Sequence, residues 1–246
     1  TTKWLNGVTV LLTDSSLIAQ VRELPFVTYV QFTGITNENN TALNAPSKVN
    51  AAETDYGVAA MQLDQMNGRI LHQHGYRGEN IHVAVLDAGF RNVNTNPAFN
   101  TLRTEGRLLG TKDFVNPQSN IYLEDAHGAY VLSTMAAEID ATYVGTAPEA
   151  SYLLIRTEAA AGEYLCEPDF WISGIEYADS AGVDLATTSL GYTTFDDSTM
   201  NYTYADMNGR TARASIAATM AYRKGIFLLN AAGNDGNKSW RYVGVP

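Results

Sequence analysis

The greater part of the chain alternates between short apolar runs and segments with helical spacing, and this order limits the folds available to it. Residues 81–86 form a nearly continuous apolar run, as in strands buried on both faces. Further strands are predicted at residues 152–155, 183–190 and 226–229. Helices are predicted at residues 58–72, 126–138, 168–181 and 211–224. This alternation predicts an α/β domain with a mostly parallel, doubly wound sheet, in which ligands bind at the carboxyl ends of the strands.

Composition narrows the class of protein. Of the 246 residues, 45% are hydrophobic and 17% charged, which is enough apolar material for a core and too little charge for disorder. The net charge of −10 argues against a nucleic acid as the main partner. No run of 18 apolar residues occurs, so no membrane span is expected. Cys166 is the single cysteine, which excludes a disulfide within the chain.

The N-terminal region is organised differently. Residues 1–33 predict a βαβ unit, with strands at 8–12 and 26–30 around a helix. A unit of this size cannot bury a core of its own, so it should pack against the rest of the chain. Residues 34–54 are polar and predict a linker. The start without Met and the loop-like end suggest a fragment or a processed piece.

Three polar residues occupy positions where such a sheet places its functional site. Asp87 directly follows the strand at 81–86, His127 opens the helix at 126–138, and Asn234 follows the last predicted strand. Taken singly, each is also typical of a turn or a helix start. Because parallel strands end at one edge, we expect the three to converge, with Asp87 and His127 within hydrogen-bond reach.

Five separated motifs, in this order, resemble those of the subtilisin-like serine proteases. They are Val-Ala-Val-Leu-Asp-Ala-Gly-Phe at 83–90, a His-Gly motif with its following helix at 127–137, Val-Gly-Thr-Ala-Pro at 144–148, Thr-Ser-Leu-Gly at 188–191 and Ala-Ala-Gly-Asn-Asp-Gly at 231–236. The resemblance covers residues 55–246. It implies a subtilisin-like catalytic domain, of which this chain would hold the N-terminal two thirds.

The resemblance also implies roles for individual residues. His127 would remove the proton of a nucleophilic serine, Asp87 would orient the imidazole, and Asn234 would stabilise the oxyanion. A peptide or protein substrate would bind at Ser189, Leu190, Gly191, Ala231 and Gly233. Ser189 is therefore interpreted as part of the substrate-binding wall and not as the nucleophile.

The N-terminal region fits the same resemblance. Residues 1–33 resemble the last part of an inhibitory α+β propeptide, and residues 34–54 would hold the processing junction. The resemblance implies a secreted or exported enzyme that requires no cofactor. Structural calcium is left open, because its oxygen ligands have no spacing that the sequence shows.

The chain departs from the family pattern at three points, of which Tyr130, in place of a frequent His, is expected only to change packing. Ala88 stands where the family usually has Ser or Thr, so one hydroxyl partner of the Asp87 carboxylate is missing. The sequence contains neither a Gly-Thr-Ser motif nor a Gly-x-Ser-x-Gly motif for the nucleophile. We therefore expect this chain alone to be inactive. We also expect it to associate with the C-terminal remainder of its own protein or with another copy.

Other interpretations remain open. A non-catalytic binding or scaffolding relative with the same fold would explain the missing serine and Ala88. A nucleotide-binding α/β domain is disfavoured, because no phosphate-binding loop follows any predicted strand. Four acidic residues are interpreted as a solvated acidic loop and not as a metal site: Glu158, Glu163, Glu167 and Asp169. Cys166 has no base placed near it by the sequence, so a catalytic thiol is not expected.

Overall fold

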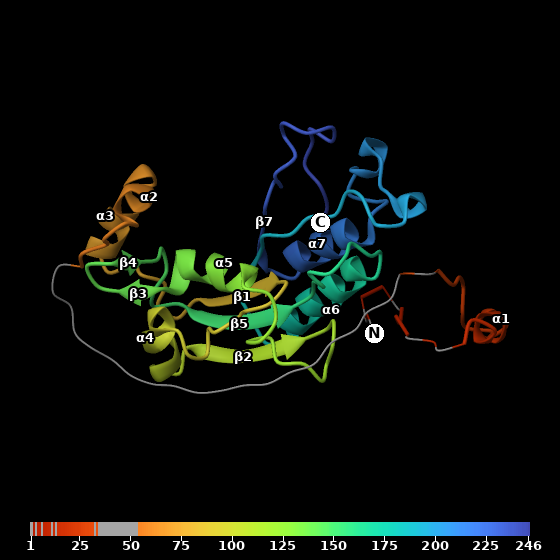
Figure 1. Ribbon diagram of the computed structural model, residues 1–246, viewed down its shortest axis with the longest axis horizontal. Helices are drawn as coiled ribbons and strands as arrows, with labels where there is room; N and C mark the ends of the chain where they lie inside the picture. The colour runs from red at the N-terminus through yellow and green to blue at the C-terminus, as the bar shows by residue number, and fades with distance from the viewer. Residues whose placement is uncertain are drawn as a thin grey trace.

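A five-stranded parallel sheet forms the centre of the molecule (Figure 1). The computed structural model describes residues 2, 4–5, 7–10, 12, 14–31, 33 and 54–246. The strand order is β2-β5-β1-β6-β7, and all pairs are parallel. The strands are β1 (His82–Asp87), β2 (Leu108–Asp113), β5 (Ser151–Arg156), β6 (Leu185–Thr188) and β7 (Phe227–Asn230). The predicted mostly parallel α/β sheet is confirmed, and the edge strand β2 was not predicted because it lacks an apolar run.

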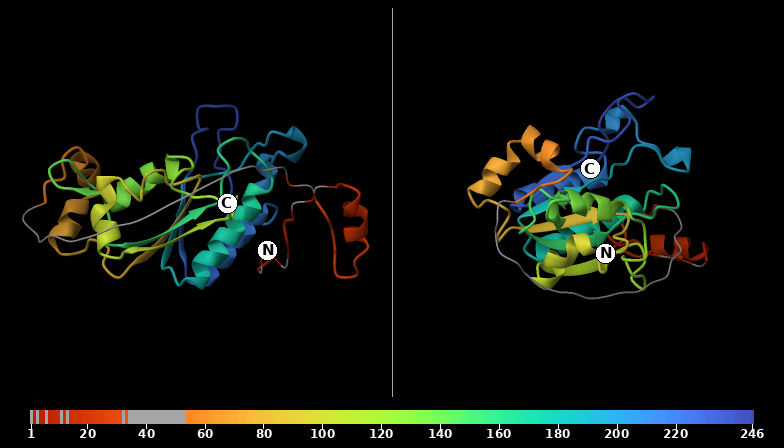
Figure 2. Two further views of the ribbon diagram at one scale, coloured as in Figure 1. Left: turned by 60° about the horizontal axis from the view of Figure 1, so that its bottom comes forward. Right: turned by 60° about the vertical axis from the view of Figure 1, so that its left-hand side comes forward.

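Helices cover both faces of this sheet, and β1 shows why. Its alternate residues Val83 and Val85 pack in a cluster with α4 (Asn100–Thr104) and α5 (His127–Ala136). Ala84 and Leu86 point to the opposite face, where they pack with α6 (Glu167–Ser180) and α7 (Arg213–Arg223). Figure 2 shows α6 and α7 side by side in this second layer. The doubly wound arrangement follows from a central strand that is apolar on both sides.

The single helix predicted at residues 58–72 is wrong. Two short helices stand there, α2 (Ala60–Gln65) and α3 (Gly68–Gln73), separated by Asn67 with a φ of 55°. A left-handed residue cannot continue an α-helix, and Asn is one of the few residues that adopts this conformation readily. The pair packs through Leu63 beside the short hairpin of β3 (Glu138–Ile139) and β4 (Tyr143–Val144).

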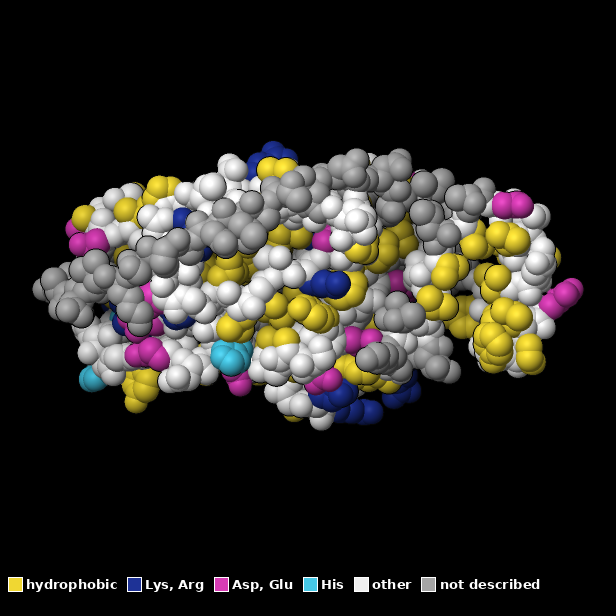
Figure 3. Space-filling view, turned by 90° about the horizontal axis from the view of Figure 1, so that it is seen from below, with side chains coloured by type: hydrophobic (Ala, Val, Ile, Leu, Met, Phe, Trp, Pro, Cys, Tyr) yellow, Lys and Arg dark blue, Asp and Glu magenta, His cyan; other side chains and the backbone are white. Residues whose placement is uncertain are grey.

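The N-terminal segment contains the predicted helix but not the predicted strands. The helix α1 spans Leu17–Arg22, whereas the described residues of 8–12 and 26–30 belong to no strand. A strand needs a hydrogen-bonded neighbour, and the described structure gives these runs none. The segment therefore exposes apolar side chains, which gather at the right-hand end of Figure 3. The exposed large apolar residues of the segment include Val8, Val10, Leu17, Leu24, Phe26 and Tyr29.

The remaining elements are short. Pro97–Phe99 (η1), Ser198–Met200 (η2) and Tyr204–Asp206 (η3) are 3₁₀ turns. Residues 34–53 of the predicted linker lie outside the described residues, so its character stays a prediction. In the described part of the chain, none of the helices has both the length and the apolarity needed to cross a bilayer.

Candidate active site

The pair Asp87–His127 lies at the carboxyl edge of the sheet. Asp87 is the last residue of the central strand β1 and is fully buried, while His127 is the first residue of α5. Nδ1 of His127 lies 2.7 Å from Oδ1 of Asp87, which confirms the predicted hydrogen bond. The same oxygen accepts a 2.7 Å hydrogen bond from the Ala88 backbone N–H. Because an ionised carboxylate only accepts hydrogen bonds, Nδ1 of His127 is the donor in this bond.

Two glycines allow the two turns to approach so closely. A Cβ on Gly89 would overlap the backbone nitrogen of Asp125, and a Cβ on Gly128 would lie 2.8 Å from the Cβ of Asp87. On the His127 side, the backbone N–H of His127 donates a 2.7 Å hydrogen bond to Oδ1 of Asp125, which fixes the start of α5. The sequence places small residues where the backbone of one turn touches the other.

Burial controls the electrostatics of the pair. Burial raises the pKa of Asp87, and the hydrogen bond from His127 acts in the opposite direction. The second carboxylate oxygen, Oδ2, is buried and has no hydrogen-bond partner in the part of the chain that the structure describes, as expected from Ala88 in place of a hydroxyl residue. The His127 side chain keeps 49% of its surface exposed. With Nδ1 bonded to Asp87, its Nε2 is the nitrogen available for proton transfer.

The predicted substrate-binding residues 189–191 follow β6, which pairs with β1 so that Thr188 is opposite Leu86. Strand β6 ends at Thr188, so the strand predicted for 183–190 extends too far. Ser189 and Leu190 are half-buried and Gly191 is exposed. The next residue, Tyr192, forms an antiparallel bridge with Val245. These residues lie beside the strand that carries Asp87, and their binding role stays a prediction.

Asn234 lies in the loop after β7, which is separated from β1 by one strand. Asn234, Ala231 and Gly233 are all exposed. In Figure 1 this blue loop projects away from the sheet. The structure thus brings Asp87 and His127 together, whereas the convergence of Asn234 with the pair stays a prediction.

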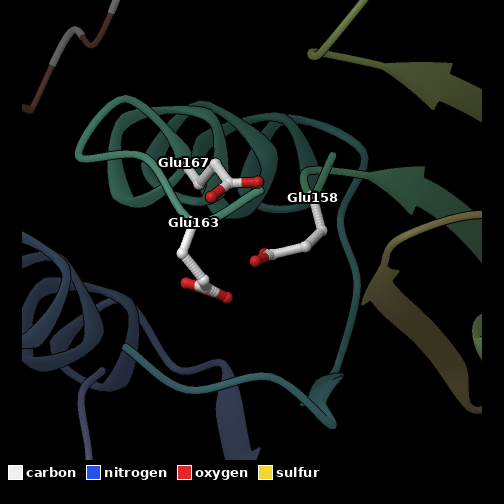
Figure 4. A group of neighbouring side chains, drawn as sticks. All are labelled: Glu158, Glu163 and Glu167. Atoms are coloured by element: carbon white, nitrogen blue, oxygen red, sulfur yellow. The ribbon is translucent and has the colours of Figure 1, made fainter. Parts of the chain in front are cut away.

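A cluster of carboxyl groups near the site was missed by sequence reasoning. Glu158, Glu163 and Glu167 have carboxylate oxygens within 4.8 Å of one another and point toward a common centre (Figure 4). Glu158 and Glu167 are buried, as is Asp169, so the predicted solvated acidic loop is wrong. The segment folds inward because Glu167 begins α6 and accepts hydrogen bonds from the backbone N–H groups of Ala159 (2.8 Å) and Tyr164 (2.7 Å).

The carboxyl cluster is chemically suited to hold protons. Burial raises the pKa of Glu163 to about 7 and that of Glu167 to about 8, and the pKa of Glu158 lies well above its ordinary value for the same reason. Glu158 accepts a 3.0 Å hydrogen bond from the Tyr192 hydroxyl. Calcium takes six to eight oxygen ligands. Two of the three carboxyl groups are engaged by N–H or O–H donors, and structural calcium stays an open expectation.

Two further residues complete the surroundings. Cys166 is buried, and burial raises its thiol pKa to about 12, which keeps the thiol protonated and unreactive. Arg156, at the end of β5, is 1% exposed and donates a 2.9 Å hydrogen bond from Nε to the carbonyl oxygen of Ala88. Its position at the end of an apolar run, next to a predicted site, is the signal that could have identified it.

Comparison with known proteins agrees with this geometry. A model of the subtilase family, peptidase S8, matches residues 78–246, more than half of the chain. Subtilisin E of Bacillus subtilis is 29% identical over 249 aligned positions, which cover 99% of this chain and 54% of that protein. The major intracellular serine protease of the same organism is 29% identical over 66% of this chain and 46% of its own length. The chain therefore spans about half the length of these relatives.

A solved structure supports the fold. The crystal structure of MycP1 from the ESX-1 type VII secretion system aligns with a TM-score of 0.50 and 18% identity, covering 85% of this chain and 58% of that one. This alignment supports the subtilisin-like arrangement of the sheet and its helices. The chain is a member of the subtilase family of serine proteases.

Proposed function

We propose that the protein to which this chain belongs is a serine endopeptidase that cleaves peptide bonds by Ser/His/Asp chemistry. The observation that carries the proposal is the 2.7 Å hydrogen bond between His127 Nδ1 and the buried carboxylate of Asp87. This bond keeps the proton of a neutral imidazole on Nδ1 and leaves Nε2 as a base. Because the chain spans about half of its relatives' length, the activity concerns the whole protein.

The proposed reaction needs a serine that this sequence does not contain in a family motif. Nε2 of His127 takes the proton of that hydroxyl as the oxygen attacks the substrate carbonyl carbon. The imidazolium, stabilised by Asp87, then gives the proton to the leaving amine, and water completes the cycle by the same route. Asn234 would donate to the oxyanion. In subtilisin such a donor contributes roughly 3–4 kcal/mol of transition-state stabilisation.

The substrate is proposed to bind as an added strand. Ser189, Leu190 and Gly191 continue from β6 at the edge where Asp87 lies, with Ala231 and Gly233 beyond the neighbouring strand β7. An extended peptide placed beside residues 189–191 would bond through its backbone, which makes affinity depend little on side chains.

Residues 1–33 are proposed to be the remnant of an inhibitory propeptide, joined through residues 34–54 to the catalytic domain at 55–246. Described contacts of the segment with the second helical layer support this proposal. The backbone N–H of Trp4 donates a 2.8 Å hydrogen bond to the Glu176 carboxylate, and Thr9 Oγ1 donates a 3.1 Å bond to Asp169. Arg213 donates a 2.9 Å bond to Gln31. We further propose that the protein is exported, because in the family that the chain resembles such a propeptide accompanies secretion. One of the relatives, however, is named as an intracellular protease.

A second candidate is a non-catalytic binding or scaffolding role. Two observations favour it: Oδ2 of Asp87 is buried without a partner among the described residues, and no Gly-Thr-Ser motif occurs in the sequence. A relative that no longer needs catalysis would tolerate both. The two candidates differ in whether the full-length protein contains a reactive serine.

The test uses the full-length protein and a fluorophosphonate probe together with a fluorogenic peptide. The endopeptidase proposal expects one labelled serine and peptide cleavage, which His127→Ala lowers by about six orders of magnitude, as for the equivalent histidine in subtilisin. The control His74→Ala changes an exposed histidine and leaves cleavage unchanged. The isolated 246-residue chain should neither react nor cleave. Absence of labelling in the folded full-length protein would instead support the binding role.

A further inference from the structure

Arg156 is a buried cation that has no role in the proposed chemistry. We propose that Arg156 is a positioning residue for the Asp87–His127 pair, because its guanidinium joins the turn after Asp87 to the turn before His127. The inference deepens the proposed function and rests on it for its catalytic meaning. The geometry itself can be tested without catalysis.

The first contact of Arg156 fixes the turn after Asp87. Arg156 ends β5 and is the register partner of Asp87, which ends β1. Its Nε donates to the Ala88 carbonyl oxygen at 2.9 Å. The N–H of the same residue, Ala88, donates to Asp87 Oδ1 at 2.7 Å. Both backbone polar groups of Ala88 are therefore engaged, one by the guanidinium and the other by the carboxylate that orients His127.

The second contact anchors the guanidinium. Nη1 of Arg156 lies 3.1 Å from Oδ2 of Asp113, at the end of β2. The Asp113 carboxylate also accepts hydrogen bonds from the backbone of Val115 and Asn116 (2.8 Å each) and from the Ser119 hydroxyl (2.7 Å). A carboxylate with this many donors has one orientation, so the cation bound to it is held as well.

The third contact reaches the histidine side. Nη2 of Arg156 lies 3.7 Å from Oε2 of Glu124. Glu124 is 12% exposed in its side chain and precedes Asp125, whose carboxylate accepts the backbone N–H of His127 at 2.7 Å. One guanidinium thus contacts the segments that carry both members of the pair. A planar fork with five N–H donors can do this, whereas the single ammonium of lysine cannot.

The missing hydroxyl at position 88 makes the contact between Arg156 and the Ala88 backbone more important for the orientation of His127. Oδ2 of Asp87 has no hydrogen-bond partner, so among the described residues the carboxylate is oriented through Oδ1. The orientation of His127 therefore depends on the position of the Ala88 backbone, which Arg156 holds. A buried ion pair by itself gives little net stability over apolar packing. The arrangement is better explained by positioning than by stability.

The test is nuclear magnetic resonance of the chain labelled with ¹⁵N-histidine. His127 should show an Nδ1–H resonance from its bond to Asp87. His72 is an internal reference, because its buried ring is bonded at Nδ1 to the Tyr56 hydroxyl (2.9 Å) and at Nε2 to the Thr146 carbonyl (3.0 Å). Arg156→Met should make the His127 proton exchange with water at least about tenfold faster and leave His72 unchanged. In Arg156→Lys, the exchange rate of the His127 proton should lie between those of the parent chain and Arg156→Met.

The matched control is Arg103→Met, which removes a guanidinium bonded to the carbonyl oxygens of Val93 (2.5 Å) and Asn96 (2.9 Å) and should not affect His127. An unchanged His127 signal in folded Arg156→Met overturns the proposal, and so does an equal change at His127 and His72. If Arg156→Met does not fold, the His127 and His72 signals of Arg156→Lys and Glu124→Gln test the proposal in the same way. A full-length protein without peptidase activity would refute the proposed function and leave this result standing.

Discussion

A Cβ placed on Gly128 would lie 2.8 Å from the Cβ of Asp87, so the helix that carries His127 touches the strand that carries its partner. Gly128→Ala should push the start of α5 away from β1. Overpacking of this kind lowers the free energy of unfolding by about 1–3 kcal/mol. Urea unfolding measures the loss, and the His127 Nδ1–H signal should weaken. Gly236→Ala, where an added Cβ meets nothing within 4 Å, is the control; equal stability of the two variants would contradict the prediction.

The carboxyl cluster should make the protein less stable as pH rises. The folded pKa values of Glu163 and Glu167, about 7 and about 8, lie above the ordinary 4.5. The folded state therefore binds more protons than the unfolded state in this range. Its stabilising contribution is complete below about pH 4.5 and is lost as pH rises through about 7–8. Urea unfolding at pH 5.5 and 8.5 should show the lower stability at pH 8.5.

Glu163→Gln should reduce this pH dependence, since it removes one proton-binding group from the cluster. The control Glu23→Gln removes the same charge from an exposed position and should leave the pH dependence unchanged. If both variants behave like the parent chain, the three carboxyl groups do not share protons.

Tyr192→Phe should destabilise the same cluster. The Tyr192 hydroxyl is fully buried and donates its 3.0 Å hydrogen bond to Glu158. Its removal leaves a buried carboxyl group without that donor, and the expected loss is about 1–3 kcal/mol of unfolding free energy. The bond also lowers the pKa of Glu158, so its loss should raise that pKa further. Thermal unfolding of the variant measures the loss. In the same measurement Tyr222→Phe, at a side chain that is 72% exposed, should have no effect.

Arg213→Met should loosen the N-terminal segment. Arg213 contacts Gln31 through Nη1, and its Nε lies 3.1 Å from Asp169, which in turn binds Thr9. We expect faster hydrogen exchange in residues 14–31 and unchanged exchange in α5. The control Arg223→Met changes an exposed arginine on the same helix. Unchanged exchange in Arg213→Met would mean that the segment is held by other contacts.

The isolated chain should self-associate. On β7, Phe227 is 61% exposed and Leu229 is 47% exposed, which is unusual for a strand of a parallel sheet. Sedimentation should detect dimers or larger species, and Phe227→Lys with Leu229→Lys should shift the chain toward monomer. Lysines at Val58, which precedes α2, and at Met61, which lies within it, serve as the control, since these side chains are 76% and 68% exposed. A monomeric parent chain would contradict the prediction.

The sequence could predict the central sheet and the Asp87–His127 pair because both depend on local patterns. Asp87 follows the nearly continuous apolar run at 81–86, and His127 opens a helix with a small residue after it. Their convergence then follows from the common edge of parallel strands. The break between α2 and α3 depends on the backbone of one residue, Asn67, which hydrophobic spacing does not reveal.

Other features depend on contacts between distant segments. Arg156 reaches Ala88, Asp113 and Glu124 only because β5 lies between β1 and β2, and β2 has no pattern that predicts a strand. The carboxyl cluster depends on Tyr192, which follows β6 and donates its hydroxyl hydrogen bond to Glu158, just after β5. Acidic residues in a loop predict exposure by composition alone, and only the tertiary contacts reverse that expectation.

The hydrogen bond between Asp87 and His127 joins parts of the chain that differ in mobility. Asp87 is anchored in a strand with neighbours on both sides, which can open only when the sheet itself comes apart. His127 stands at the first turn of a ten-residue helix with half of its side chain in water, where fraying requires little free energy. Heating or mild denaturant should therefore separate the pair while the sheet is still intact, so that the capacity for proton transfer disappears before the fold does.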